Sequence, residues 1–547
     1  MQPAEDRRTA VDTRAHERRW WILGVLCLSL LIVFVGNSSL NVAIPTLARD
    51  LHATESELQW VVASYSLVFA GLLFSTGAIG DRFGRKGALQ LGLVVFVAGA
   101  VLASQGTAMW QLIACRALMG LGAAFIMPST LSILVNVFPP AERTKAIAIW
   151  AATTGAAGAV GPVASGWLLG HFWYGSIFLI NVPFITLALV AGWWLVPRSK
   201  DPEQAKLDPV GAVLSTVGIA ALVYGLIQAP DKGWGNPVTI GTFAIALVVL
   251  ALFSLWELRK REPMLDIRYF RNRAFSTGTG GMVLVFLAMF GVMFLITQYF
   301  QLVLGYSPLS AALRLLPIAP IMIVVAPLTP RLSARFGAHR TVAFGMALIA
   351  AGMLMFQRLD PHTSYLYVLV CLLPLVSGIA LAMSPMTAAI MSAVPPRRAG
   401  AGSAMNDATR ELGAALGVAV LGSVAASRYT ASLGHALTGL SSSARSAARA
   451  SIAGALHVAA GLHGTAAHTL ASAAKSAFVD GVHLAAIAGA ALAAIAAIAT
   501  YRRLPHQLAH EGALHGPAEA VEEIAELGIA GVPPAFPDQP DPALARR

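Results

Sequence analysis

The chain has 547 residues, of which 56% are hydrophobic and only 12% are charged, and its mean hydropathy is +0.68. A soluble domain of this size would carry roughly 25% charged residues, so the composition excludes an ordinary soluble globular protein. The formal net charge of +11 comes from basic residues that recur between apolar runs, which argues against a concentrated nucleic-acid-binding face.

Apolar runs of about 18 to 25 residues recur along the chain, and each is long enough to cross roughly 30 Å of hydrocarbon. The first run follows Arg18 and Arg19 and is too long for the apolar core of a signal peptide, so it predicts a first span. We predict an all-α polytopic membrane protein with fourteen spans, near residues 21–43, 58–79, 87–104, 110–134, 145–170, 176–196, 209–228, 238–258, 274–300, 309–329, 341–357, 366–390, 401–426 and 480–500.

The distribution of basic residues supports this count. If both termini are cytoplasmic, the inside segments hold 28 of the 38 Lys and Arg, the outside segments hold seven, and three lie within spans. Cytoplasmic loops carry such an excess of positive charge. A missed or invented span would reverse the sidedness of everything after it. We therefore expect a multi-pass protein of the cell (inner or plasma) membrane with both termini in the cytoplasm.

A short charged turn separates the second and third predicted spans. It reads Gly77-Ala-Ile-Gly80-Asp81-Arg82-Phe83-Gly84-Arg85-Lys86. Lipid cannot solvate these charges, so the turn must lie at the water interface. The simplest interpretation is a positive-inside anchor with no further role. The order of glycines, acid and bases is more specific than a basic run, and we predict a cytoplasmic gate formed by Gly77, Asp81, Arg82, Gly84, Arg85 and Lys86.

A degenerate copy of this turn occurs later in the chain. Arg335-Phe336-Gly337 follows Arg82-Phe83-Gly84 by 253 residues, with Ala334 in the place of Asp81. Paired repeats are expected of a transporter whose two halves rock around a central site. We predict a cytoplasmic segment at 1–20, six-helix halves at 21–196 and 274–500, two additional spans at 209–258 and a cytoplasmic tail at 501–547.

The segment 427–479, rich in Ala, Ser, Gly and His, is a long extracellular loop on this topology. Its spacing is helical but it has few large apolar residues, so we expect a helical hairpin lying on the membrane. His457, His463 and His468 are six and five residues apart, which does not place all three on one helix face. We therefore predict solvated histidines, no metal site and no cofactor. We expect no fixed structure in the Pro-, Ala- and Glu-rich tail after Leu504.

Two acids lie inside an apolar run, Asp407 and Glu411 in the thirteenth predicted span. Burying a charge in a membrane is costly and usually has a functional cause. The two acids are four residues apart and share a helix face, with Arg410 beside them. They form either an internal ion-pair group that fixes the helix or a site for protons or a cationic substrate.

Arg116 lies in the fourth predicted span and has no acidic neighbour in the sequence. It needs a partner from another helix, a bound anion or water, unless backbone carbonyls hold it. We predict that Asp407, Glu411, Arg410 and Arg116 take part in proton coupling.

The fifth predicted span carries Gly158, Gly161, Pro162 and Gly166. Glycines allow close helix approach, and Pro162 removes one backbone hydrogen bond. The pattern fits ordinary small-residue packing or a hinge, and we predict a hinge.

Other predicted spans carry polar and aromatic side chains. Each of them, taken alone, is typical of a helix–helix contact, but we expect that together they contribute to a substrate cavity. These residues are Asn37, Asn41, Trp60, Tyr65, Asn181, Gln298 and Gln301.

Together these motifs resemble the fourteen-span drug:H+ antiporter (DHA2) branch of the major facilitator superfamily. The Gly77–Lys86 turn resembles the first signature of the superfamily, and the segments around Arg116 and Gly158–Gly166 resemble its signatures in spans four and five. Two further stretches resemble the fourteen-span branch specifically: Gln298-Tyr-Phe-Gln301 with Leu304-Gly305-Tyr306-Ser307-Pro308, and Arg410-Glu-Leu-Gly-Ala-Ala-Leu-Gly417. The resemblance implies a major facilitator fold and proton-driven, alternating-access export of amphipathic small molecules, often antibiotics or cationic drugs.

One position departs from the pattern of this branch. Relatives commonly have an aspartate at the start of the first-span motif, where this chain has Gly36. An aspartate able to pair with Arg116 and take up a proton is therefore missing, which places more weight on Asp407 and Glu411.

The partners implied are a drug-like small molecule, protons and the lipid bilayer, without nucleic acid, in a monomer. The alternative function is proton-coupled or facilitative transport of an endogenous metabolite, lipid or siderophore, since a fold does not fix a function. A membrane scaffold is a weaker interpretation because it needs no paired halves. An enzyme is weaker still, because the sequence shows no metal, nucleophile–base or phosphate-binding pattern.

Overall fold

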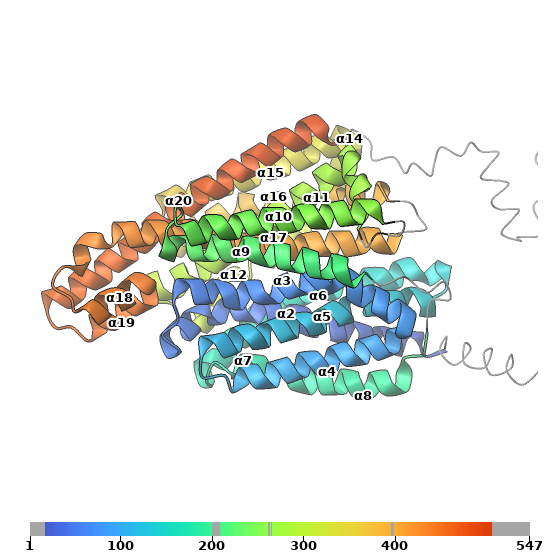
Figure 1. Cartoon of the computed structure of the whole chain (residues 1–547), viewed down its shortest axis with the longest axis horizontal. Helices are drawn as coiled ribbons and strands as arrows, with labels where there is room; N and C mark the ends of the chain where they lie inside the picture. The colour runs from blue at the N-terminus through green and yellow to red at the C-terminus, as the bar shows by residue number, and fades with distance from the viewer. Residues whose placement is uncertain (1–16, 200–207, 261–262, 264, 395–398, 506–547) are drawn as a thin grey trace, which may run out of the picture.

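The computed structural model describes residues 17–199, 208–260, 263, 265–394 and 399–505, and the regular elements in these ranges are all helices (Figure 1). The all-α fold predicted from the sequence is confirmed. The first sixteen residues and the tail from residue 506, for which cytoplasmic segments were predicted, lie outside the described residues.

Residues 19–195, the first six-helix half, form one bundle, coloured blue to cyan in Figure 1. In this bundle α3 and α4 both pack on α5, while α2 packs on α6 and α8. Its helices are α2 (Arg19–Asp50), α3 (Glu55–Phe83), α4 (Arg85–Ser104), α5 (Met109–Val137), α6 (Pro140–His171), α7 (Ser176–Leu179) and α8 (Asn181–Leu195), of which α7 and α8 together form the sixth predicted span.

The second bundle is built from the last part of the chain. In it α11 packs on α16 and α17, and α15 packs on α16 and α20. Its elements are η1 (Ile267–Arg271), α11 (Arg273–Gln298), the π-turn η2 (Tyr299–Val303), α12 (Pro308–Leu315), α13 (Ile318–Val325), α14 (Leu328–Phe336), α15 (Ala338–Met355), η3 (Phe356–Arg358), α16 (Tyr365–Ser392), α17 (Ala399–Ser432), η5 (Gly434–Leu437), α18 (Ser442–Ala450), α19 (Ile452–Ala460) and α20 (Thr465–Arg503).

Two predicted spans have a different form in the structure. The tenth, expected as one helix at 309–329, is divided into α12, α13 and α14. Prolines cause these breaks, because each lacks a backbone N–H and clashes with the preceding turn; Pro317 and Pro327 stand at the junctions. The last span, expected at 480–500, belongs to α20, which begins fifteen residues earlier at Thr465.

The inserted pair α9 (Pro209–Lys232) and α10 (Pro237–Arg259) lies against both bundles. Val223 and Ile227 of α9 pack between α3 and α17, against residues that include Ala63 and Ala415. The carbonyl of Ile227 accepts a hydrogen bond from Ser56 of α3, and that of Leu226 accepts one from Ser423 of α17. The α9 helix therefore bonds to both halves at one of their seams.

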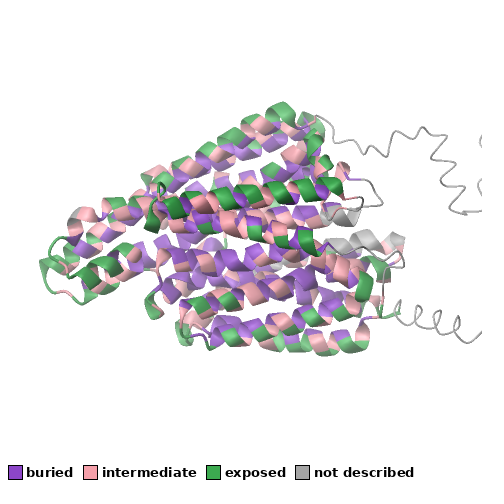
Figure 2. Ribbon diagram, viewed as in Figure 1, coloured by how far each residue is buried: buried purple, intermediate pink, exposed green. Residues whose placement is uncertain are grey.

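The outer surface of the bundle is apolar. Large side chains such as Trp194 of α8 and Leu247 of α10 are exposed, and Figure 2 shows exposed residues along the outward faces of the long helices. Soluble monomers rarely expose so much apolar surface. Thirteen helices in the described part are long and apolar enough to cross a membrane. The α6 helix, whose side chains are only partly described, covers the fifth predicted span, so the count of fourteen is consistent with the structure.

The two halves meet along α3 against α17, α2 against α11, and α6 against α12. We call the end of the bundle that carries the turn between α3 and α4 the Asp81 end, and the opposite end, where α3 begins at Glu55, the far end.

Candidate functional site

Arg116 of α5 is the largest fully buried side chain in the described residues, and its exposed fraction is 0%. Its guanidinium donates to the carbonyls of Val61 at 3.2 Å and Gly36 at 3.3 Å, and to Asn37 Oδ1 at 3.3 Å. The ring of Tyr65 lies under it, 4.3 Å from Cζ. Three acceptors and one aromatic face thus hold the cation, mainly through backbone carbonyls.

Gly36 has a direct part in this arrangement, because its carbonyl is one of the Arg116 acceptors. A Cβ at this position would point towards Phe96, 3.1 Å from Cζ, and towards Asn181. The position where the resemblance placed an aspartate therefore faces an aromatic ring, and Arg116 is held without that carboxylate.

Glu411 of α17 is the buried acid of the second half, with an exposed fraction of 8% and no hydrogen-bond partner for Oε2 within the described residues. It lies beside Ser66 of α3 and within electrostatic reach of Arg116 and Tyr65. The residues predicted for proton coupling are therefore divided between the halves: Arg116 belongs to the first half, and Glu411 belongs to the second.

Asp407 lies one turn before Glu411, Arg410 directly precedes it, and Asp407 and Arg410 pair with each other. Arg410 Nη1 is 3.6 Å from Asp407 Oδ1, and the guanidinium also lies over the ring of Phe286, 5.0 Å from its centroid. Arg410 therefore compensates Asp407 on the same helix and also lies within electrostatic reach of Glu411, which sits beside Ser66 of the other half.

Within the described residues, three side-chain hydrogen bonds join the halves towards the far end. Gln298 of α11 donates to Glu55 Oε1 at 3.1 Å, and Gln301 of η2 donates to the carbonyl of Val42 at 2.8 Å. Ser423 of α17 donates to Gln59 Oε1 at 3.2 Å. Gln298 and Gln301, predicted for a substrate cavity, here lie in contacts that hold the two halves together.

Glu55 and Gln59 were not among the residues selected from the sequence. Glu55 is the first residue of α3, where an acid is an ordinary helix-terminus residue. Gln59 follows one turn later. The signal that could have found them is the position of two long polar side chains at the start of an apolar run, on the same face.

The remaining predicted cavity residues do not form one group. Asn37 and Tyr65 lie at Arg116, as described above. Asn181 is buried and bonds to carbonyls of its own chain segment at Ile177 and Phe178. Trp60 lies apart, 6.1 Å from the ring of Tyr224 in α9. Asn41 of α2 is buried with no hydrogen-bond partner for Oδ1 within the described residues.

The glycines of α6 differ from one another. A Cβ on Gly161 would overlap the hydroxyl of Ser38 in α2, and one on Gly166 would lie 2.8 Å from Leu309 Cα in α12. A Cβ on Gly158 would meet nothing within 4 Å. Pro162 lies inside an otherwise continuous helix. The close approach of α6 to α2 at Gly161 and to α12 at Gly166 therefore favours glycine at these two positions, whereas Gly158 has no such neighbour.

The charged turn closes in its own half. Asp81 accepts from Arg85 at 2.8 Å and from Ser132 of α5 at 3.3 Å. Lys86 donates to the carbonyl of Trp193 at 2.7 Å. Gly84 has a φ of 126°, which favours glycine, and Gly337 in the degenerate copy has a φ of 88°. Among the other predicted gate residues, Arg82 is exposed. A Cβ added to Gly77 would lie 3.5 Å from Pro128 Cβ.

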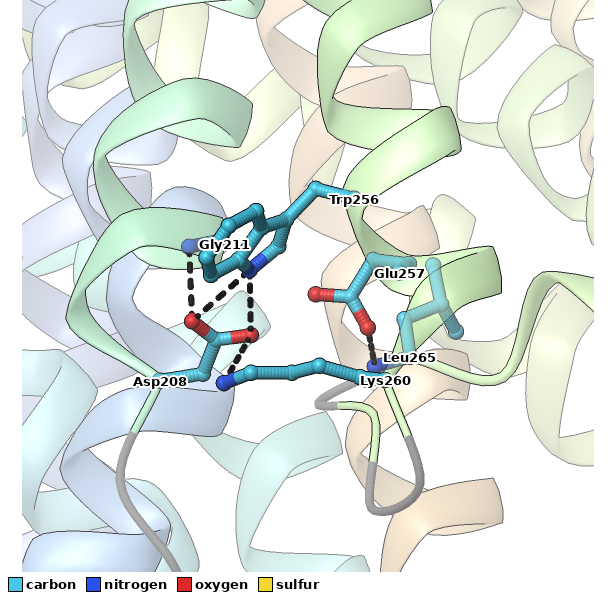
Figure 3. Close-up of polar contacts among 6 residues, drawn as sticks. All are labelled: Asp208, Gly211, Trp256, Glu257, Lys260 and Leu265. Atoms are coloured by element: carbon cyan, nitrogen blue, oxygen red, sulfur yellow. Dashed lines mark hydrogen bonds and ion pairs between the residues drawn. The ribbon is translucent and has the colours of Figure 1, made fainter.

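A second polar cluster lies where the inserted pair begins and ends (Figure 3). Asp208 caps α9 by accepting from the Gly211 N–H at 2.9 Å, and it also accepts from Trp256 and from Lys260 Nζ at 2.9 Å. Burial opposes ionisation of Asp208, but these donors outweigh it, and the pKa of the carboxyl is lowered. Beside it, Glu257 accepts from the Leu265 N–H at 3.1 Å, so the cluster ties α9 and α10 to the segment that leads into α11.

The sequence profile of the Major Facilitator Superfamily matches residues 26–418, well over half of the chain. The chain belongs to the Major Facilitator Superfamily. It is therefore a multi-pass membrane transporter of small molecules and not an enzyme.

Curated relatives of this transporter are resistance and export proteins. The chain is 35% identical over 490 residues to the multidrug efflux pump LfrA of Mycolicibacterium smegmatis, covering 89% of this chain and 97% of the relative. It is 33% identical to the tetracenomycin C resistance and export protein of Streptomyces glaucescens, covering 89% and 92%. The multidrug resistance protein Stp of Mycobacterium tuberculosis is 35% identical over 74% of this chain and 76% of its own length. The resemblance to drug exporters is confirmed.

Solved structures agree on the fold. An inward-facing, unoccupied bacterial homologue of the human lysosomal transporter Spinster superposes with a TM-score of 0.62 at 18% identity, covering 89% of this chain and 97% of that chain. A POT family transporter in complex with 5-aminolevulinic acid gives a TM-score of 0.56 at 16% identity, covering 73% and 89%. These likenesses concern the fold alone.

Proposed function

We propose that this transporter exports hydrophobic or amphipathic small molecules, including drugs and antibiotics, by proton antiport. It acts as a monomer in the cell membrane, with the Asp81 end and both termini in the cytoplasm. The names of the relatives, at 33–35% identity over much of the chain, support the substrate class. The excess of basic residues in the predicted cytoplasmic segments supports the orientation.

The observation that carries proton coupling is the position of Glu411. It is buried beside Ser66 of the other half, one of its oxygens has no hydrogen-bond partner in the described part of the chain, and it lies within electrostatic reach of Arg116 across the interface and of Arg410 on its own helix. An ionised Glu411 attracts Arg116 and favours close approach of the halves at their centre, whereas a protonated Glu411 does not. Proton binding at this carboxyl thereby changes the balance between two arrangements.

Alternating access is supported by the unequal ends of the molecule. Hydrogen bonds between the halves lie towards the far end, whereas Asp81 bonds to Arg85 and Ser132 of its own half. We propose that Asp81, with Arg82 and Arg85, bonds to the second half when the cytoplasmic side closes. In that state the Gln298 and Gln301 contacts break, and the glycine face of α6 at Gly161 and Gly166 accommodates the change.

Transport in proteoliposomes tests this proposal. The wild type, reconstituted with an imposed pH gradient, is expected to move a fluorescent lipophilic cation such as ethidium against its concentration gradient. A difference of one pH unit is worth about 1.4 kcal/mol per proton, enough to drive roughly tenfold accumulation. Glu411→Gln is expected to abolish accumulation driven by the pH gradient while it retains exchange of ethidium down its gradient. Asp407→Asn is the neighbouring variant for comparison.

Three outcomes would contradict parts of the proposal. Accumulation that stays proton-driven in the Glu411→Gln and Asp407→Asn double variant would remove these carboxyls from coupling. Movement of the probe only down its gradient in the wild type, with no response to pH, would instead favour a facilitative carrier. Full transport by Asp81→Asn would contradict the role of the charged turn.

A further inference from the structure

Glu55 lies at a corner of the far end where the two halves and the inserted pair meet. It is the first residue of α3, and its carboxylate accepts from Gln298 of α11 at 3.1 Å. Asp231, in the last turn of α9, and Tyr429 of α17 lie within electrostatic reach of it. Glu55 is partly buried, whereas Gln298 is fully buried. One carboxylate is thus surrounded by residues of both halves and of α9.

The charge of Glu55 has no basic counterpart among the described residues. The charged group that acts on it is Asp231, a second acid, which itself accepts from the Ser56 hydroxyl. Lys232, the residue after Asp231, donates to the hydroxyl of Tyr224 at 3.2 Å and lies over that ring. Two neighbouring acids without a compensating base create a negative potential, which attracts cations.

Glu55 also begins a polar stripe on the face of α3 that meets the second half. Glu55, Gln59 and Ser66 are four and seven residues apart, which places them within about 40° of one another around the helix. Gln59 accepts from Ser423 of α17, and Ser66 lies beside Glu411. From Glu55 to Ser66 the stripe is roughly 16 Å long, at about 1.5 Å per residue. It therefore leads from the far end to the level of Glu411.

Opening of the far end would change the surroundings of Glu55. Its bond to Gln298 joins the halves, as does the bond of Gln59 to Ser423, so neither can persist when the halves separate there. The polar stripe then faces the space between the halves, where a carrier built of two halves holds its substrate. Glu55 loses its amide donor in that state, and a carboxylate without a donor needs a new partner.

We propose that Glu55 binds the cationic group of a substrate at the far end of the transport path. When the far end is closed, the Gln298 amide occupies the carboxylate. When it is open, the cation of the substrate takes the place of that amide. Glu55 thereby favours lipophilic cations over uncharged molecules. This inference rests on the proposed export of amphipathic molecules between the halves, and it assigns a residue that selects for their charge.

Binding of ethidium to the purified full chain tests the proposal. Fluorescence anisotropy in an uncharged detergent gives the Kd of the wild type and of each variant. Glu55→Gln removes the charge, while its amide oxygen can still accept from Gln298. The Kd of this variant is expected to rise about threefold to tenfold, because one charge-assisted contact with the cation is lost.

Gln298→Ala separates the charge from the closing contact. This variant keeps the Glu55 carboxylate but removes its donor, so the open arrangement becomes more populated and the Kd should fall about twofold or more. If Glu55 served only to close the far end through Gln298, the two variants would shift the Kd in the same direction. The double variant should lose the gain of Gln298→Ala, because the freed position then holds no charge.

Two further variants control for general charge effects. Asp50→Asn removes a negative charge from the exposed end of α2, within electrostatic reach of Tyr174 in the same half, and it should leave the Kd unchanged. Glu55→Asp retains the charge, and its Kd should stay closer to that of the wild type than the Kd of Glu55→Gln.

Three results would overturn the assignment of Glu55 while the export proposal stands: an equal Kd in the wild type and Glu55→Gln, shifts in the same direction in Glu55→Gln and Gln298→Ala, or an equal rise in Asp50→Asn. Absence of ethidium binding in the wild type and in every variant would instead contradict the proposed substrate class, and this inference with it. The two failures are therefore distinguishable.

Discussion

Arg116 and Glu411 are both buried charges at the centre of the molecule, one in each half, yet their surroundings differ. Arg116 has two backbone carbonyls, the Asn37 amide and the Tyr65 ring around it. Glu411 is buried with one oxygen that has no partner within the described residues. Each of the three guanidinium nitrogens of Arg116 has an acceptor, whereas the buried Glu411 has a carboxyl oxygen without one in the described residues. On the proposed coupling, the first half supplies a fixed cation and the second half supplies the carboxyl that changes protonation state.

The largest expected effect distinguishes these two roles. Arg116→Met removes three buried hydrogen bonds of a charged group and leaves Asn37 Oδ1 without this donor, and we expect a loss of roughly 3 kcal/mol or more in the free energy of unfolding. Glu411→Gln keeps the shape of the side chain and should cost less than about 1 kcal/mol. Thermal unfolding of the two purified variants in detergent measures the difference. The reverse order would show that Glu411, and not Arg116, holds the interface.

The next effect concerns the helix that carries Gly36 and Asn37. A methyl group on Gly161 would overlap the Ser38 hydroxyl and lie 3.3 Å from the Val35 carbonyl oxygen, so Gly161→Ala should displace that hydroxyl from its contacts with Val35 and Ala157 and destabilise the protein by about 1–3 kcal/mol. Gly158→Ala is the matched control, because its Cβ would be in open space. The control should be neutral or slightly stabilising, since alanine favours a helix. Equal shifts in the two unfolding midpoints would contradict this account.

A third variant tests whether Arg116 needs a carboxylate. A side chain at position 36 would point towards Phe96 and Asn181. Gly36→Asp is therefore expected to lower stability by about 1 kcal/mol through overpacking. Gly36→Ala, which adds only the Cβ, should have a smaller effect. A rise in the unfolding midpoint of the aspartate variant at neutral pH would show that it pairs with Arg116, and that the carbonyl arrangement replaces a missing partner.

The smallest effect lies away from the centre, at Asp208. Its lowered pKa means that its stabilising contacts are complete above the ordinary value of about 3.9 and are lost only as the pH falls through the lower folded-state pKa. Asp208→Asn should therefore cost about 1 kcal/mol, and the difference from wild type should be constant between pH 5 and pH 8. A difference that shrinks within this range would show that Asp208 titrates there, against the direction of its shift.

The sequence was sufficient to predict the parts of this molecule that depend on composition and periodicity. The all-α fold and the buried positions of Arg116 and Glu411 follow from apolar runs interrupted by charge. The acceptors of Arg116 could not be predicted, because backbone carbonyls have no sequence signature. The contact of Glu55 with Gln298 was also missed, since it joins residues 243 positions apart and an acid at a helix start has an ordinary local explanation.

The position of α9 has a consequence for symmetry. A chain of two related halves would present two similar flanks to the lipid, but here α9 fills the angle between α3 and α17 and bonds to both, while α6 and α12 meet directly on another flank. Any change in the angle between α3 and α17 must also displace α9 and, through Asp208 and Glu257, the segment leading into α11. In the proposed alternating-access cycle the inserted pair would move with the two halves, and a displacement of α9 would report on that motion from outside the central interface.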